Sequence, residues 1–266
     1  MAWVTVAGSD IGGREEQQDF YLKVRSSDHN YNLLAVADGA GGHKMGALAA
    51  QTVIQCIREN LPALERSEDP TSFIGQLIVE CNQRVLKVGD SEMACSTLVL
   101  VFIKGEELFW GHIGDSRLYL IRDNKVIFQT TDHSTEELQK NGNDECMEND
   151  FSTVSSGLYM CLGALPNIIY DVESGLAREG DILLLCSDGL WGQMDMDRMI
   201  AELSTSSLNP ENVTTWLTQA RQLKQERSDN ITLLAAKYGG EPSSFSRLLT
   251  ALTKPFRNLM KGAKVT

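Results

Sequence analysis

Residues 33–39 read LLAVADG, an apolar run that ends in an Asp-Gly pair, and residues 182–189 repeat the pattern as ILLLCSDG. Apolar runs of this length, bounded by turn residues, are typical of strands that are buried on both faces. A carboxylate at the end of such a strand is held on a rigid scaffold, and the following glycine lets a ligand or another backbone segment approach closely. Asp-Gly is also a common turn sequence, so each pair taken alone favours a simple turn.

Further short runs of strand character surround these two. Strands are predicted at residues 3–7, 21–24, 32–37, 96–103, 108–113, 117–121, 125–128, 169–176, 181–186 and 231–237, and amphipathic helices at 46–59, 70–87, 195–203 and 211–224. Residues 108–128 look like a meander of antiparallel strands, because Gly114-Asp115-Ser116 and Asp123-Asn124 supply turn residues. Since strands and helices cluster in blocks, the sequence predicts an α+β fold with antiparallel sheets.

Composition limits the possible partners. The chain has 266 residues, 42% of them hydrophobic, and its 24 Lys and Arg against 36 Asp and Glu give a net charge of -12. This charge repels nucleic acid and favours cations or basic protein segments as partners. No signal peptide or transmembrane run is visible, so we expect a cytoplasmic protein. Its cysteines form no C-x-x-C pair, which suits a reducing compartment: Cys56, Cys81, Cys95, Cys146, Cys161 and Cys186.

Five aspartates flank predicted strands in the same manner. They are Asp19, Asp38, Asp115, Asp188 and Asp229. Carboxylates without histidine or cysteine partners are the ligands that hard divalent ions such as Mg²⁺ and Mn²⁺ prefer. His112, inside a predicted strand, and His133, in a predicted turn, are interpreted as structural.

Six short motifs then occur in a fixed order. They are Arg14-x-x-x-x-Asp19, Asp38-Gly39-x-Gly41-Gly42, Gly114-Asp115-Ser116-Arg117, Thr131-Asp132-His133-Ser134, Ser187-Asp188-Gly189-Leu190-Trp191 and Asp229-Asn230-Ile231-Thr232. Each motif is weak alone, but the ordered set, from about Val6 to Lys237, closely resembles the metal-dependent type 2C protein phosphatases, and in particular their bacterial members. The resemblance implies a central β-sandwich of two antiparallel sheets, flanked by pairs of α-helices in four αββα layers.

The resemblance also assigns a metal site at one end of the sandwich. It implies that Asp38 bridges two divalent cations, Mn²⁺ or Mg²⁺, that Asp188 and Asp229 hold the first, and that the Gly39 carbonyl joins Asp38 on the second. Asp19 would act through water.

Other residues of the motifs receive further roles from the same resemblance. Asp115, together with Asp188, matches the acids that hold a third, weaker cation, and Arg14 matches the arginine that binds the substrate phosphate. Asn230 and Ser116 are assigned supporting roles.

The function implied is a metal-dependent protein serine/threonine phosphatase. Two cations about 4 Å apart would lower the pKa of a bridging water, and the resulting hydroxide would attack phosphorus directly, without a phosphoenzyme. No motif supplies a Ser or Cys nucleophile. Expected partners are phosphoserine and phosphothreonine proteins, either substrates of a Ser/Thr kinase or the kinase itself, and the chain is expected to be a monomer.

Two alternatives stay open at this point. One is a catalytically weak or inactive family member that binds phosphoproteins as a regulatory module, although the presence of Arg14, Asp38, Asp188 and Asp229 argues against it. The other is a small-molecule phosphoesterase or a nuclease, of which the nuclease is disfavoured by the acidic charge.

The chain departs from the family pattern at several positions. Ala40 stands where animal members have a histidine that protonates the leaving group, and His43 is either a substitute acid or a helix-start residue. Gln18 and Gly192 replace acids, which predicts weaker binding of the second metal.

Two segments are predicted to vary from the family. Residues 135–159 form an acidic loop that either favours phosphosites in basic surroundings or is simply solvated. Residues 1–240 are expected to form the catalytic domain, and residues 241–266 a basic amphipathic tail. The tail would bind an anionic membrane surface or a partner, or would fold back on the acidic domain.

Overall fold

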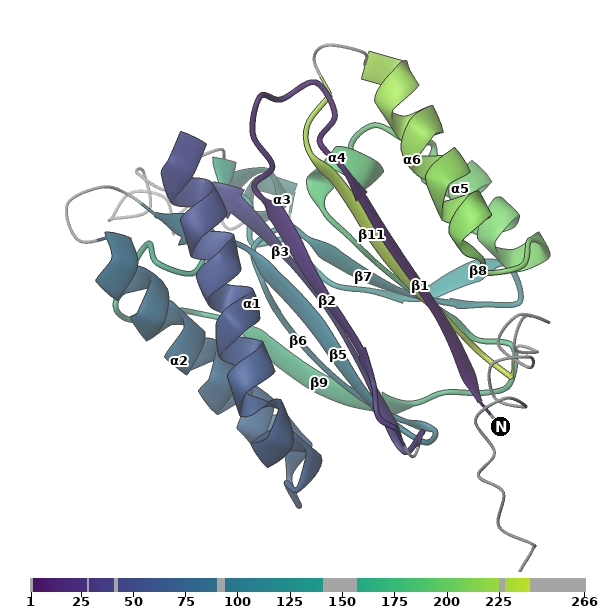
Figure 1. The fold of residues 1–266 in the computed structure, drawn as a ribbon, viewed down its shortest axis with the longest axis horizontal. Helices are drawn as coiled ribbons and strands as arrows, with labels where there is room; N and C mark the ends of the chain where they lie inside the picture. Colours follow the sequence, from purple (N-terminus) through teal and green to yellow (C-terminus); the bar gives the residue numbers. More distant parts are fainter. Residues whose placement is uncertain are drawn as a thin grey trace, which may run out of the picture.

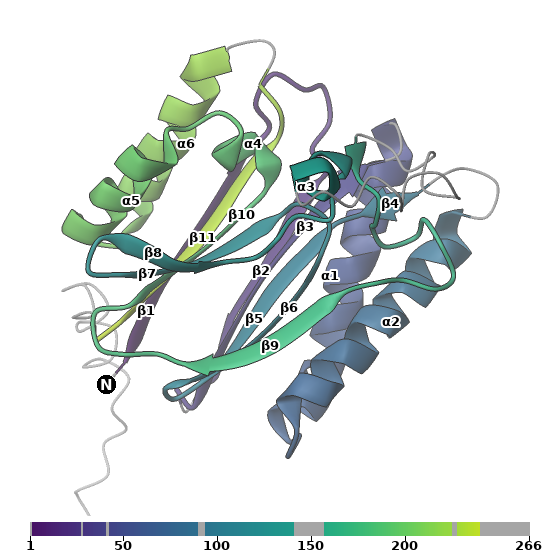
Figure 2. The same ribbon diagram turned by 180° about the vertical axis from the view of Figure 1, so that it is seen from behind.

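Two β-sheets pack face to face, and a pair of long helices covers the outer face of each sheet (Figures 1 and 2). The computed structural model describes residues 2–27, 29–40, 43–89, 94–140, 157–224 and 228–239. Within these residues the layers run helices, sheet, sheet, helices. The predicted α+β class and αββα arrangement are therefore confirmed.

The first sheet contains the run LLAVADG at its centre. Its strand order is β2 (Asp19–Arg25), β3 (Tyr31–Ala40), β5 (Leu98–Lys104), β6 (Glu107–Ile113) and β9 (Asp171–Leu176), with β4 (Cys95–Ser96) paired to β3. Along β3, Leu33 and Ala35 face helices α1 (His43–Glu65) and α2 (Pro70–Gly89), whereas Leu34 and Val36 face the other sheet. Burial on both faces explains why this strand is continuously apolar.

The second sheet contains the other Asp-Gly strand. Its order is β1 (Trp3–Asp10), β11 (Ile231–Tyr238), β10 (Ile182–Cys186), β7 (Arg117–Arg122) and β8 (Lys125–Gln129), and all of these pairs are antiparallel. Helices α5 (Met196–Thr205) and α6 (Pro210–Lys224) pack on its outer face (Figure 1). Two short helices lie near the strand ends, α3 (Thr135–Lys140) and α4 (Asp188–Trp191).

The predicted meander over residues 108–128 is wrong in its first half. Strand β6 pairs with β5 and β9 in one sheet, whereas β7 pairs with β8 and β10 in the other, so residues 114–116 carry the chain from sheet to sheet. Gly114 has φ +102° and sits so close to Thr97 that an added Cβ would lie 2.7 Å from its methyl group. The turn residues were read correctly, but sequence does not distinguish a hairpin from a crossing between sheets.

The observed ends of several helices and strands also differ from the predicted ones. Helix α1 starts before the predicted residue 46 and continues past 59 through Pro62, because Leu61 and Leu64 extend the buried stripe. The predicted strand 96–103 is divided at Thr97 into β4 and β5, and the expected loop 135–159 begins with helix α3.

Some sequence predictions concern segments that lie outside the described residues. These are Gly41 and Gly42, Cys146, most of the acidic loop and the tail. The five described cysteines are buried with free thiols. In the described part of the chain, no helix has both the length and the apolar character needed to cross a bilayer.

The inner core between the two sheets predicts a stability effect. Leu34 on β3 is fully buried there, so Leu34→Ala should lower the free energy of unfolding by about 2–5 kcal/mol, measured by urea denaturation. Leu176→Ala, on the edge strand of the same sheet where the side chain is 68% exposed, is the matched control and should change it by less than about 0.5 kcal/mol. Equal effects of the two substitutions would contradict this account of the core.

Candidate active site

The five predicted aspartates meet at one end of the sandwich. In antiparallel sheets the start of one strand lies beside the end of its neighbour, so residues at such ends share an edge. Asp19 begins β2 and pairs directly with Asp38 near the end of β3. Asp188 follows β10 and Asp229 precedes β11, which are neighbours in the second sheet, and Asp115 lies in the crossing between the sheets.

Their pKa values show how strongly these carboxyls interact. Burial raises the pKa of Asp38 well above its usual range, and the charges of Asp19, Asp188, Asp115 and Asp229 raise it further. Burial raises the pKa of Asp19 to about 7. Burial, followed by the charge of Asp188, raises the pKa of Asp115 to about 7. The pKa of Asp188 is also raised, first by burial and then by Asp229. Such a cluster needs protons or cations to be stable.

Unpaired oxygen atoms indicate whether protons or cations suit this cluster. Among the described residues, Oδ1 of Asp19 and Oδ1 of Asp188 are buried and have no hydrogen-bond donor. The other oxygen of Asp19 accepts a 2.7 Å hydrogen bond from the hydroxyl of Ser187, and Asp19 as a whole is 3% exposed. Buried acceptor oxygens without donors, converging from several carboxylates, suit a hard divalent cation.

Other backbone segments pack closely around Asp38 and Gly39. A Cβ atom on Gly39 would lie 2.0 Å from the carbonyl oxygen of Gly46 in α1, so this position requires glycine. The N–H of Asp38 donates to the Thr97 hydroxyl at 3.1 Å, and that hydroxyl also bonds the hydroxyl of Ser116 at 2.7 Å. Ser116 thus links the crossing that carries Asp115 to the strand that carries Asp38.

Arg14 lies at the edge of the cluster. Its Nη2 atom is 2.7 Å from Oδ2 of Asp229, and its side chain is 58% exposed. Asn230 fixes the loop that carries Arg14: its Oδ1 accepts from the N–H of Gln18 at 2.7 Å, and its Nδ2 donates to the carbonyls of Ile11 at 2.8 Å and Glu16 at 3.1 Å. The structure therefore places an accessible guanidinium beside the carboxylates.

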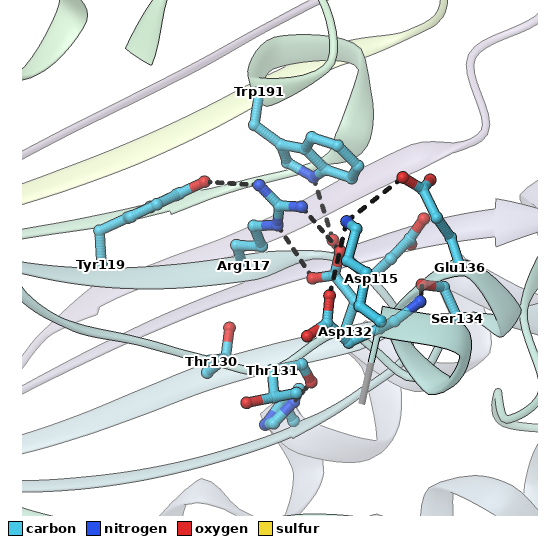
Figure 3. Close-up of polar contacts among 12 residues, drawn as sticks. Asp115, Arg117, Tyr119, Thr130, Thr131, Asp132, Ser134, Glu136 and Trp191 are labelled. Atoms are coloured by element: carbon cyan, nitrogen blue, oxygen red, sulfur yellow. Dashed lines mark hydrogen bonds and ion pairs between the residues drawn. The ribbon is translucent and has the colours of Figure 1, made fainter. Parts of the chain in front are cut away.

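Sequence reasoning did not find a second group of contacts, which Figure 3 shows. The indole Nε1 of Trp191 donates to the backbone carbonyl of Asp115 at 3.0 Å, and the guanidinium of Arg117 lies 3.5 Å from the centroid of the Trp191 ring. Arg117 in turn makes two hydrogen bonds to Asp132, at 2.9 and 2.7 Å. Arg117, Asp132 and Trp191 all belong to the six motifs, but nothing in their spacing indicated that they touch.

The two histidines form a separate cluster with Asp171. Their rings stack with centroids 4.8 Å apart, and the ligand atoms of His112, His133 and Asp171 lie within 4.8 Å of one another. Nε2 of His112 donates to the Thr131 carbonyl at 2.8 Å, while Nδ1 of His133 accepts from the N–H of Gly114 at 3.1 Å. Nε2 of His112, the ring atom nearest to Asp171, is thus already used by the Thr131 carbonyl, and Nε2 of His133 lies 3.2 Å from Oδ2 of Asp171. These contacts fit the predicted structural role.

The departures from the family pattern are partly visible. Ala40 is half-buried at the end of β3, and the side chain of His43 lies outside the described residues. Gly192 caps α4 by donating its N–H to the Asp188 carbonyl at 2.8 Å.

Comparison with known proteins agrees with this arrangement. The sequence pattern of the protein phosphatase 2C family matches residues 9–224. The serine/threonine phosphatase stp of Listeria welshimeri is 28% identical over 236 residues, covering 85% of this chain and 88% of that protein.

Solved structures give the same result. The catalytic domain of the serine/threonine protein phosphatase PstP, in complex with two manganese ions, has 26% identity and a TM-score of 0.73, covering 88% of this chain and 97% of that one. MsPP of Mycobacterium smegmatis, a PPM Ser-Thr phosphatase in complex with cacodylate, has 29% identity and a TM-score of 0.69, covering 89% and 98%.

The family pattern spans most of the chain and includes Arg14 and four of the five aspartates, while Asp229 follows it. The fold, its order of strands and the acidic end of the sandwich are consistent with that match. The chain therefore belongs to the protein phosphatase 2C family of metal-dependent serine/threonine protein phosphatases.

Proposed function

We propose that this protein hydrolyses phosphoserine and phosphothreonine in proteins with two divalent cations, Mn²⁺ or Mg²⁺, bound among its five aspartates. The observation that carries the proposal is the convergence of these carboxyls, two of them with buried oxygens that lack donors, beside the exposed guanidinium of Arg14. The relative crystallised with two manganese ions supports the choice of metal.

The family resemblance implies how the ligands divide, and the charge interactions among the acids support it. Asp38 interacts with all four other acids, which suits a carboxylate shared by both cations. Asp188 and Asp229, which interact with each other, would complete the first position, and the Gly39 carbonyl would join Asp38 at the second. Asp19, the most deeply buried, would act through a water molecule. When bound, the cations would lower the pKa of a water molecule and so supply hydroxide at neutral pH.

Arg14 would bind the substrate phosphate. A guanidinium offers paired donors that match two phosphate oxygens, and this one is accessible from solvent and directed at the carboxylates. Because Asn230 holds the backbone on both sides of Arg14, binding of the phosphate would cost little backbone freedom of this loop. Direct in-line attack needs no protein nucleophile, and hence no phosphoenzyme.

The acidic surroundings favour phosphosites that have basic neighbours. The chain carries a net charge of -12, and the side chain of Glu136, in the first turn of α3, is 80% exposed. Like charge would repel acidic peptides. We propose cytoplasmic phosphoproteins as substrates, including targets of a Ser/Thr kinase or the kinase itself, with the chain acting as a monomer. The basic tail from residue 241 would bind a partner or an anionic membrane surface.

The first prediction concerns activity. Asp188→Ala should reduce Mn²⁺-dependent phosphate release from a phosphothreonine peptide by at least about a hundredfold, because it removes a carboxylate from the cation cluster. Asp197→Ala, an exposed acid in the first turn of α5, is the matched control and should keep wild-type activity.

Failure of the wild type to release phosphate at any metal concentration, with a native circular dichroism spectrum, would replace this function with the phosphoprotein-binding module. Retained activity in Asp188→Ala would refute the assigned site.

The second prediction concerns pH. In metal-free protein, Asp19 and Asp115 hold protons up to about pH 7, whereas in the unfolded chain they lose them near 3.8. Their raised pKa values therefore make the metal-free fold less stable as pH rises through this window. Mn²⁺ must displace these protons, so its effect on Tm should be larger at about pH 7.5 than at about pH 5.5.

The check is a thermal melt at fixed Mn²⁺ and at both pH values, with a chelator as reference. Asp19→Asn, which cannot hold the proton, should show a smaller difference between the two pH values. An equal gain in Tm at both pH values in the wild type would contradict the assignment of these carboxyls as ligands.

A further inference from the structure

Asp115 and Asp188 reach the cluster from different parts of the fold. Asp115 lies on the crossing from β6 to β7, and Asp188 begins α4 directly after β10. The two segments are in contact, because Trp191 of α4 donates a hydrogen bond to the backbone carbonyl of Asp115 at 3.0 Å. This inference rests on the proposed function and adds to its two cations the weaker third cation that the family resemblance assigns to Asp115 and Asp188. If they share it, some contact must fix the distance between their two backbone segments, because each carboxylate repels the other.

Trp191 makes such a contact. It is the last residue of the single turn α4 that Asp188 begins, and this turn is closed by N–H bonds from Leu190 to Ser187 and from Gly192 to Asp188. From the end of the turn, the Trp191 indole Nε1 donates to the carbonyl of Asp115 at 3.0 Å. One side chain thus joins the turn of one carboxylate to the main chain of the other.

The indole ring of Trp191 packs in turn against the guanidinium of Arg117 (Figure 3). The Arg117 guanidinium lies 3.5 Å from its ring centroid, and the guanidinium is fixed by two bonds to Asp132 and by one to the Tyr119 hydroxyl at 3.1 Å. Asp132 is 8% exposed, and the ion pair with Arg117 compensates the burial of its charge. Arg117 is therefore directed at Asp132 and Trp191, and its hydrogen bonds are not made to the cation cluster.

We propose that Trp191, supported by Arg117 and Asp132, is a positioning residue that fixes the spacing of Asp115 and Asp188 and so sets the affinity of the weaker cation site between them. Trp191 touches neither substrate nor reacting atoms in this arrangement. Its effect is on metal affinity. The two tighter cations are assigned to Asp38, Gly39, Asp188 and Asp229, whereas the weaker cation also needs Asp115, the residue whose backbone carbonyl Trp191 holds.

The test substitutes the indole without removing the ring. Trp191→Phe keeps an aromatic face over Arg117 but loses the N–H donor. Calorimetric titration with Mn²⁺ should show two tight sites unchanged and a weaker site whose Kd rises about three- to tenfold, the equilibrium change that one ordinary hydrogen bond supports. In phosphopeptide hydrolysis, the Mn²⁺ requirement should rise while kcat recovers at saturating Mn²⁺.

Trp191 and Arg117 each have a matched control. Trp216→Phe also loses an indole donor, to Glu202 at 3.0 Å, but lies in α6, and should leave Mn²⁺ binding unchanged. Arg117→Lys should weaken the third site, whereas Arg122→Lys should not, although Arg122 makes the same two-bond pairing with buried Asp181 at the other end of β7.

Three outcomes would overturn the proposal. The first is an unchanged weak-site Kd in Trp191→Phe, and the second is an equal change in Trp216→Phe, which would indicate general destabilisation. The third is a wild-type titration with two sites only. All three leave the proposed phosphatase function standing, since it requires two cations. Absence of phosphopeptide hydrolysis in the wild type would instead refute that function, while the calorimetric comparison would still decide the role of Trp191.

Discussion

Mutual repulsion among five carboxyl groups is the constraint on which the rest of this structure depends. Burial and like charge both disfavour the ionised forms of Asp19, Asp38, Asp115 and Asp188, so the carboxyl groups of the cluster would separate in a flexible chain. They are held together because each is attached to the end of a strand or to a short turn between strands. The cations proposed above would thus bind at a site that exists before binding, with little reorganisation when they arrive.

The rigidity needed to hold these acids comes from the layers behind them. The inner faces of both sheets form a continuous apolar core, and each outer face is covered by its own helix pair. Hydroxyl and amide groups then secure the strand ends: Thr97 with Ser116, Ser187 with Asp19, and Asn230 with the loop of Arg14. Small polar side chains are suited to this task, because they satisfy backbone groups without occupying the space that ligands need.

The sequence predicted those elements correctly whose residue pattern is local and recurs along the chain. The two apolar runs that end in Asp-Gly predicted central strands with carboxylates at one edge, and the ordered motifs predicted the αββα layers. The sequence-based prediction was wrong where two different structures have the same local sequence pattern. Gly114-Asp115-Ser116 has turn residues whether the chain folds back or crosses to another sheet, and Pro62 gave no hint that α1 continues to Glu65. The contact of Arg117 with Trp191 depends on tertiary packing of residues far apart in the chain, which no spacing rule encodes.

The division of the acids between the sheets has a mechanical consequence. Asp19 and Asp38 belong to the first sheet, while Asp188 and Asp229 adjoin strands of the second, and the hydroxyl of Ser187 already bonds Asp19 across the gap. An ion bound by members of both pairs, as proposed, would cross-link the two sheets. Such an ion would resist shear of one sheet over the other, in addition to the crossing at residues 114–116 that already joins the two sheets at this end.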